Sequence, residues 1–248
     1  MTVVLLHALG VDARMWVAQE RALRAAGHDV WAPHQRGHGG VPLGAAEPSL
    51  AVVADDVARG LDERGAERAV LAGTSMGGYV AMAFLRRHPG RTAALALLGT
   101  RAAADDPATA AHRGRFADAV LDPATRARAL AAVVPGFVGG TTRARRPEVV
   151  ERVTALVGAA APATVAWCQH AIAARPDSFD VLRAADVPAV VVAGAEDALV
   201  PEKEARLMAE ALPRGELVVV PDAGHLAAME TPGEVTSALA DLLRRTGW

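Results

Sequence analysis

Short apolar runs alternate along both ends of the chain with longer stretches in which apolar residues recur every three to four positions. Continuous apolar runs rich in β-branched residues are typical of strands buried on both faces of a parallel sheet. Recurrence at helical spacing is typical of helices that pack one face against such a sheet. The runs predict strands at residues 2–6, 28–32, 68–72, 92–98, 187–193 and 216–220.

The stretches between these runs predict helices that cross from one strand to the next. A helix over 49–64 would be capped by Ser49 and ended by Gly65. Further helices are expected at residues 15–26, 76–87, 202–212 and 232–245. Strictly alternating strands and helices predict an α/β fold with a doubly wound, mostly parallel sheet of about six strands.

The alternation stops between residues 101 and 184. This segment carries helix formers and six prolines but no strong strand run. We therefore expect a core made of residues 1–100 and 185–248, with residues 101–184 inserted as a helical cap after the strand at 92–98.

Composition narrows the class of function. The chain has 248 residues and a net charge of −2 with both signs interspersed, so no nucleic-acid partner is expected and a small-molecule substrate is favoured. No long uncharged apolar run is present, and no membrane span is expected. Cys168 is the only cysteine, which excludes an internal disulfide and makes the cytoplasm the default location. Oligomeric state is left open.

The sequence GTSMGG at residues 73–78 lies between a predicted strand and a predicted helix. It matches G-x-S-x-G, in which flanking glycines allow a turn so sharp that the serine is strained and its hydroxyl exposed. Ser75 is therefore a candidate nucleophile. The Met76 amide, at the start of the helix, is a candidate donor to a developing oxyanion.

A nucleophilic serine needs a base and a group that orients the base. Two predicted strands end in loops that hold such groups, GAED at 194–197 and DAGH at 222–225. Catalytic triads whose serine lies on a nucleophile elbow follow the chain order serine, acid, histidine, and Ser75, Asp197 and His225 have this order. Glu196 is a second candidate acid, and two further carboxylates are alternatives, Asp222 and Asp186.

A second oxyanion donor is expected from HALG at residues 7–10, which follows the strand predicted to neighbour the elbow strand, and Leu9 is the candidate. With HALG, GTSMGG, GAED and DAGH, the sequence resembles the α/β-hydrolases. The resemblance implies Ser75 as nucleophile, Asp197 as acid, His225 as base, and the Leu9 and Met76 amides as oxyanion hole. It also implies that neither a metal nor another cofactor takes part.

Within that family the sequence looks most like the 3-oxoadipate enol-lactonase and small carboxylesterase group. Two positions depart from the family pattern: Ala8 replaces a glycine, and His34 stands where an aspartate is common. His7, His34 and His38 lack the compact spacing of metal ligands. The expected activity is that of a serine hydrolase acting on a small carboxylic ester or lactone through an acyl-enzyme.

Relatives with the same triad leave alternatives open: a carbon–carbon bond hydrolase, a thioesterase or a non-hydrolytic biosynthetic enzyme. A non-catalytic ligand-binding protein of this fold is a further alternative, which an intact triad disfavours. In the cap, Phe137, Trp167 and His170 are predicted to roof the site, since the last two share a helical face. A mostly apolar pocket that favours compact neutral or aromatic acyl groups is expected.

Overall fold

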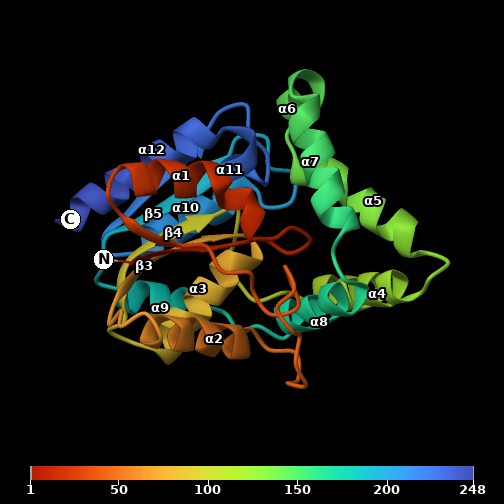
Figure 1. The fold of residues 1–248 in the computed structure, drawn as a ribbon, viewed down its shortest axis with the longest axis horizontal. Helices are drawn as coiled ribbons and strands as arrows, with labels where there is room; N and C mark the ends of the chain where they lie inside the picture. The colour runs from red at the N-terminus through yellow and green to blue at the C-terminus, as the bar shows by residue number, and fades with distance from the viewer. Residues whose placement is uncertain (1, 248) are drawn as a thin grey trace.

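In the computed structural model, which describes residues 2–247, six parallel strands form one sheet in the order β2-β1-β3-β4-β5-β6 (Figure 1). The predicted α/β fold with about six strands is confirmed. The strands are β1 (Thr2–Leu6), β2 (Asp29–Trp31), β3 (Ala69–Thr74), β4 (Thr92–Leu98), β5 (Ala189–Gly194) and β6 (Gly215–Val220).

Helices cover both faces of the sheet because its side chains alternate in direction. Val3 and Leu5 of β1 join the apolar cluster that includes α1 (Val17–Ala25) and α12 (Pro232–Arg245). Val4 and Leu6 join the cluster of the other face. That second face is covered by α2 (Leu50–Asp62), α3 (Met76–Arg87), α9 (Phe179–Ala184) and α10 (Glu202–Ala211).

Local signals fix several helix starts. Ser49 caps α2 by accepting a hydrogen bond from the Ala51 amide at 3.2 Å, as its sequence position predicts. The first predicted helix begins instead with a 3₁₀ turn, η1 (Ala13–Trp16), capped by Asp12. The carboxylate of Asp12 binds both the amide and the guanidinium of Arg14. A 3₁₀ turn is a common way for a helix to begin.

Residues 101–184 contain six helices joined by short loops, and no strand. Five of the helices stand together beyond the carboxyl ends of the strands (Figure 1): α4 (Pro107–Leu121), α5 (Arg126–Phe137), α6 (Gly140–Arg145), α7 (Pro147–Gly158) and α8 (Pro162–Ala173). The sixth, α9, packs against the core helices α3 and α10. The division into a core and a cap with boundaries at 101 and 184 stays a prediction.

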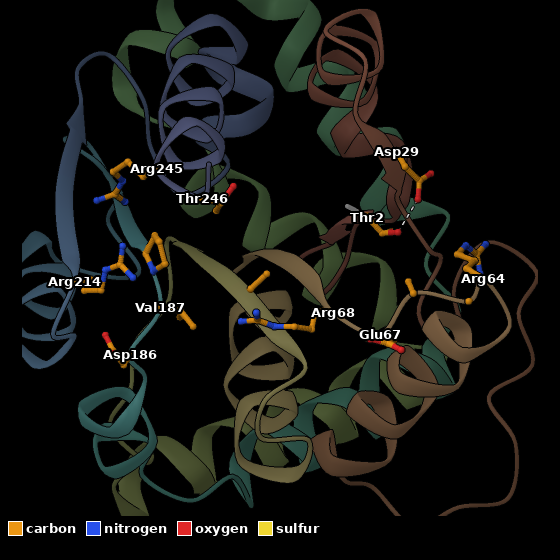
Figure 2. A pocket seen from close by; sticks show the side chains of 14 residues that line it. Thr2, Asp29, Arg64, Glu67, Arg68, Asp186, Val187, Arg214, Arg245 and Thr246 are labelled. Carbon is orange, nitrogen blue, oxygen red and sulfur yellow. Dashed lines mark hydrogen bonds between the residues drawn. The ribbon is translucent and has the colours of Figure 1, made fainter. Parts of the chain in front are cut away.

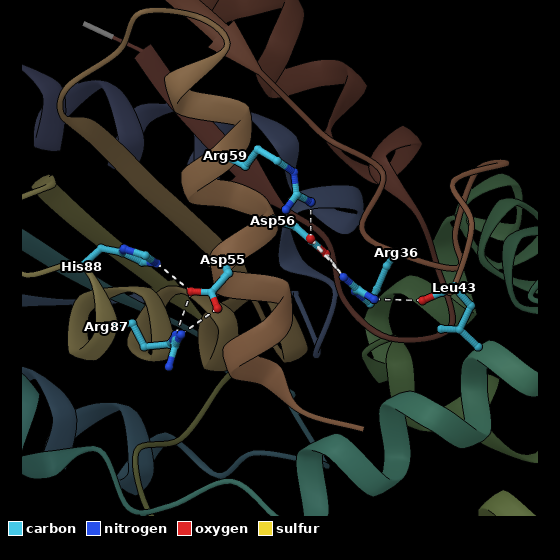
Figure 3. A network of polar contacts seen from close by, with 7 residues as sticks. All are labelled: Arg36, Leu43, Asp55, Asp56, Arg59, Arg87 and His88. Carbon is cyan, nitrogen blue, oxygen red and sulfur yellow. Dashed lines mark hydrogen bonds and ion pairs between the residues drawn. The ribbon is translucent and has the colours of Figure 1, made fainter. Parts of the chain in front are cut away.

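The cap rests on a long loop between β2 and α2. The Thr164 hydroxyl donates to the Gly37 carbonyl at 3.0 Å, and Trp167 Nε1 donates to the Ala46 carbonyl at 2.8 Å. Figure 3 shows how this loop is held to α2: Arg36 binds the Asp56 carboxylate and donates to the Leu43 carbonyl. The loop is thereby fixed between the core and α8.

Among the described residues, no single helix is long and apolar enough to cross a membrane. The pair Pro147–Gly158 and Pro162–Ala173 meets the length and composition test only when joined, and it is bent by 94°. The cytoplasmic location expected from the sequence stays a prediction.

Candidate active site

Ser75 lies at a sharp turn between β3 and α3. Its backbone has φ 52° and ψ −113°, a strained conformation for a residue with a side chain. The turn requires glycine on both sides: a Cβ on Gly73 would come within 2.2 Å of the Gly77 carbonyl oxygen, and one on Gly77 within 2.1 Å of the Leu6 carbonyl oxygen. The Ser75 hydroxyl makes no capping bond to α3. The hydroxyl is therefore not engaged as a helix cap and can face a substrate.

Asp197 and His225 form a buried hydrogen-bonded pair. His225 Nδ1 lies 2.9 Å from Asp197 Oδ2, and the two side chains are only 4% and 1% exposed. Burial opposes ionisation of Asp197, but the bond and charge of His225, with the Val200 and Leu199 amides, hold the pKa of this carboxyl below its ordinary value. An ionised Asp197 keeps the proton of the neutral imidazole on Nδ1, so Nε2 is left able to accept one.

Ser75 and His225 line the same cavity. In the part of the chain that the structure describes, the Ser75 hydroxyl is not hydrogen-bonded to the His225 imidazole. Such a bond often forms only when substrate binds. Phe137 stacks on the His225 ring with centroids 5.9 Å apart and an interplanar angle of 18°. The cap therefore touches the imidazole directly.

The alternative carboxylates lie in other surroundings. Glu196 accepts hydrogen bonds from the amide and hydroxyl of Thr141, and these bonds lower the pKa of its carboxyl. Asp222 has a left-handed backbone with φ 55°. Asp186 lies at the opposite end of the sheet. Only Asp197 bonds to His225 among the described carboxylates.

The loop after β1 is built on a buried histidine. His7 Nε2 accepts from the Gln35 amide at 3.0 Å, so the proton lies on Nδ1, which donates to the Ala8 carbonyl at 2.9 Å. Burial, with the neighbouring His38, lowers the pKa of His7 to about 3. The neutral imidazole thus fixes the backbone beside Leu9. Ala8 needs no left-handed backbone, since among the described non-glycine residues only Ser75 and Asp222 have positive φ.

Both candidate oxyanion donors lie beside Ser75. Leu9 lines the cavity, because β1 pairs with β3 as expected and ends next to the elbow. Met76 is the first residue of α3, where helix amides lack a partner within the helix. Among residues 2–247, neither the Leu9 amide nor the Met76 amide donates a hydrogen bond to a backbone carbonyl of a loop.

The cavity encloses about 430 Å³ between the sheet and the cap. Its cap wall is mainly apolar, with side chains of α4, α5, α7 and α8, namely Phe116, Leu130, Val133, Phe137, Val157, Val165 and Ile172. Arg101, Arg113 and Gln169 add polar groups that the sequence analysis did not identify. A short acyl group fits a space of this size.

The structure corrects part of the predicted roof. Phe137 lines the cavity, but Trp167 and His170 do not. On α8 the cavity-facing positions are Val165, Gln169 and Ile172, spaced four and three residues apart. Trp167 points to the loop before α2, where its Nε1 bonds Ala46, and His170 is exposed. The pattern of apolar residues in α8 does not show which face of the helix lines the cavity.

Glu230, which the sequence analysis missed, ends the short helix α11 (Ala227–Glu230) and is 3% exposed. One carboxylate oxygen accepts from the amides of Gly224 and Leu226, on either side of His225, at 2.9 and 3.2 Å. The other accepts from the Gly139 amide of the cap at 2.7 Å. Glu230 therefore ties the histidine loop to the cap. The sequence feature that could have identified Glu230 is its position directly after the apolar run 226–229.

A second, larger hollow lies at the amino ends of the strands (Figure 2). It encloses about 760 Å³ and contains neither a serine nor a histidine. Its arginines Arg64, Arg68, Arg214 and Arg245 lie among the carboxylates of Asp29, Glu67 and Asp186 (Figure 2). Of the candidate catalytic residues only Asp186 lies in this groove, far from Ser75 and His225.

In the described part of the chain, no group of three or more His, Cys, Asp or Glu side chains is placed to hold a metal ion. His7, His34 and His38 lie near one another, yet His7 Nε2 and Nδ1 are both used by the backbone. These residues therefore do not fit a metal site.

Comparisons with known proteins agree with this geometry. The family model described as alpha/beta hydrolase fold matches residues 2–232. A pimeloyl-[acyl-carrier protein] methyl ester esterase from Aromatoleum aromaticum is 30% identical over 97% of this chain and 97% of its own. A malate-bound esterase from Thermogutta terrifontis is 36% identical, with a TM-score of 0.95 over 99% of this chain and 90% of that one.

An enol-lactonase from Burkholderia xenovorans is 27% identical and covers 98% of this chain and 91% of that one, with a TM-score of 0.88. The predicted resemblance to enol-lactonases and esterases, and the prediction of a hydrolytic enzyme, are confirmed by these relatives. The chain belongs to the α/β-hydrolase fold family.

Proposed function

We propose that this enzyme is a serine hydrolase that cleaves a small carboxylic ester or lactone through an acyl-enzyme on Ser75. The observation that carries the proposal is the buried Asp197–His225 pair, 2.9 Å apart, in the cavity that Ser75 also lines. Relatives named as esterases and an enol-lactonase support the substrate class.

In the proposed reaction, His225 Nε2 removes the Ser75 hydroxyl proton while Ser75 Oγ attacks the substrate carbonyl carbon. The carbonyl electrons move to oxygen, and the Leu9 and Met76 amides stabilise this oxyanion. When the tetrahedral intermediate collapses, the bond to the leaving alkoxide breaks and His225 returns the proton to it. Water, activated by the same imidazole, then releases the acid from Ser75.

Asp197 keeps the imidazole in one tautomer and stabilises its positive charge in both steps. Strain at Ser75 places the hydroxyl at the cavity wall without further rearrangement. The apolar cap wall excludes water from the acyl group, which strengthens the electrostatic interactions at the oxyanion.

A fluorophosphonate probe tests the proposal directly. We expect it to label Ser75 in the native protein, and Ser75→Ala to abolish both labelling and the hydrolysis of p-nitrophenyl acetate. Ser237→Ala is the matched control, because Ser237 is exposed on α12 and should keep full labelling and turnover. Labelling of Ser237, or turnover by Ser75→Ala at the native rate, would refute the assignment.

A further inference from the structure

We propose that the side chain of Tyr79 sets the longest acyl chain that this enzyme accepts, because it closes the catalytic cavity off from a neighbouring side pocket. The inference rests on the proposed function and names a residue that determines which esters the same site takes. The Tyr79 ring is a fixed wall, and its removal joins the two spaces.

The side pocket lies between α3, α8 and the start of α2. It encloses about 170 Å³, and its walls are mainly small or apolar side chains, among them Leu50, Met82 and Ala171. Its rim, which includes Pro176, is exposed to solvent. Of the described residues that line the catalytic cavity, only Tyr79 also lines the side pocket. Tyr79 is therefore the wall that the two spaces share.

Tyr79 lies one helical turn beyond the nucleophile. Its amide donates to the Ser75 carbonyl at 3.2 Å, and both residues line the catalytic cavity. In the proposed reaction the leaving oxygen has to lie near His225, which returns the proton to it, whereas the acyl carbon is bonded to Ser75 itself. The acyl chain is therefore the part of the substrate that meets the Tyr79 ring.

The packing around Tyr79 holds its ring in place. Tyr79 is 6% exposed, and the guanidinium carbon of Arg175 lies 4.1 Å from the centroid of its ring, a cation–π contact. Arg175 is itself buried, and its guanidinium donates to the carbonyls of Ile172 and Ala103 at 2.9 and 2.8 Å. The same group pairs with the buried Asp105 carboxylate at 2.9 Å. A ring that packs on so firmly anchored a group presents a constant wall.

This wall gives the native enzyme a limit on acyl length. Each methylene that leaves water for the apolar part of the cavity favours the bound state by about fourfold. A chain that reaches Tyr79 has to bend back or stay in water, so further methylenes no longer help. We therefore expect kcat/KM to rise with acyl length to a maximum and then to fall.

The test measures kcat/KM for p-nitrophenyl esters from acetate to decanoate. Native enzyme should hydrolyse the decanoate at least about tenfold less well than the butanoate, since the longer chain does not fit a cavity of about 430 Å³. Tyr79→Ala should raise kcat/KM for the decanoate relative to the butanoate by about tenfold or more, because at least two methylenes then enter the side pocket.

Two control variants separate the wall from its surroundings. Tyr79→Phe keeps the ring and should keep the native order of preference. Met82→Ala enlarges the side pocket without opening it, because Met82 lines that pocket and not the catalytic cavity, and it should also keep the native order. Tyr79→Leu removes the ring with a smaller loss of packing than Tyr79→Ala and should shift the preference in the same direction. Circular dichroism verifies the fold of each variant.

Three results would overturn the proposal. One is a native enzyme that hydrolyses the decanoate as well as the butanoate, which needs no variant. Another is an unchanged order of preference in Tyr79→Ala or Tyr79→Leu, whichever folds. The third is a Tyr79→Ala enzyme that gains activity on acetate esters of longer alcohols but not on longer acyl chains. If fluorophosphonate labels Ser75 in these experiments, only the role of Tyr79 is refuted, whereas absence of labelling would refute the proposed function.

Discussion

The two ends of the sheet carry opposite kinds of hollow. The amino-end groove is larger, about 760 Å³ against about 430 Å³ for the carboxyl-end cavity, and its four arginines are interspersed with three carboxylates. The smaller cavity is lined by a strained serine and by the histidine of a buried histidine–aspartate pair. Size therefore does not indicate the site. The site is distinguished by a strained backbone and a buried pair of polar side chains at the carboxyl ends of the parallel strands.

The largest expected effect separates the carboxylates of the two ends. Asp197→Asn should keep the fold but misorient the imidazole, and kcat should fall by about 10⁴. Asp186→Asn, in the amino-end groove, should leave kcat unchanged within experimental error. Initial rates with p-nitrophenyl acetate, supported by circular dichroism, provide the measurement.

Glu196→Gln and Asp222→Asn complete this comparison within the carboxyl end. Because Glu196 bonds Thr141 and not His225, its replacement should change kcat far less than that of Asp197. If Glu196→Gln proves the more damaging substitution, the acid has been assigned to the wrong residue.

Trp167 tests where the cavity wall ends. Because Trp167 is 8% exposed and packs outside the cavity, Trp167→Ala should lower the free energy of unfolding by about 3 kcal/mol. The order of preference among methyl esters of different acyl length should stay as in the native enzyme. Phe137→Ala, at the cavity wall, should change that order. Urea unfolding and kcat/KM across the ester series measure both. A changed order in Trp167→Ala would restore Trp167 to the roof.

Glu230 tests how the cap is held to the histidine loop. Glu230→Gln places an amide donor where the carboxylate accepts three backbone N–H groups, and it should cost roughly 2 kcal/mol in stability. Glu196→Gln also touches the cap but should cost less, since its carboxylate is only partly buried. Chemical denaturation of the two variants gives the values. Equal costs would show that Glu230 is not a special link.

An effect of similar size concerns pH and the buried His7. Its pKa is lowered to about 3 in the folded protein, so the unfolded chain binds a proton that the folded one does not between pH 6.5 and 3. The contribution of His7 to the free energy of unfolding should thus be fully present above pH 6.5 and should decrease as the pH falls, by about 2 kcal/mol at pH 5. Urea unfolding at pH 7 and pH 5 measures the loss. His7→Gln should reduce it, and an unaltered pH dependence would exclude His7 as its source.

Much of the fold could be predicted because parallel strands leave a direct record in the sequence. Runs such as TVVLL at 2–6 are buried on both faces, so no polar residue interrupts them. The end of α2 follows from a single residue, Gly65, with φ 65°. Residue-level boundaries moved where hydrogen bonding decided them, as at η1, which the helical pattern alone could not separate from α1.

The candidate site could be predicted where a motif fixes the backbone and not where packing decides. Ser75, Asp197 and His225 each follow a strand, and strand ends converge whatever the surrounding side chains are. The prediction for Trp167 was wrong because the face that α8 turns toward the cavity depends on its contacts with α4, which the sequence does not show. Arg101 and Arg113 were missed for a different reason, because arginines are usually exposed and their place in the cavity wall depends on packing.

The insertion of the helical segment between two adjacent strands has a consequence for the order of folding. β4 and β5 pair with Leu95 opposite Ala189, so their contact closes a loop of roughly 90 residues. Closing such a loop costs entropy before any contact repays it, whereas β3 and β4 pair across a much shorter connection. We expect the amides that join β3 to β4, and those that join β5 to β6, to gain protection first in pulsed hydrogen exchange during refolding, and the amides that join β4 to β5 later. Ser75 lies on one side of that late closure and the Asp197–His225 pair on the other, so the candidate nucleophile would meet this pair only in the last stage of folding.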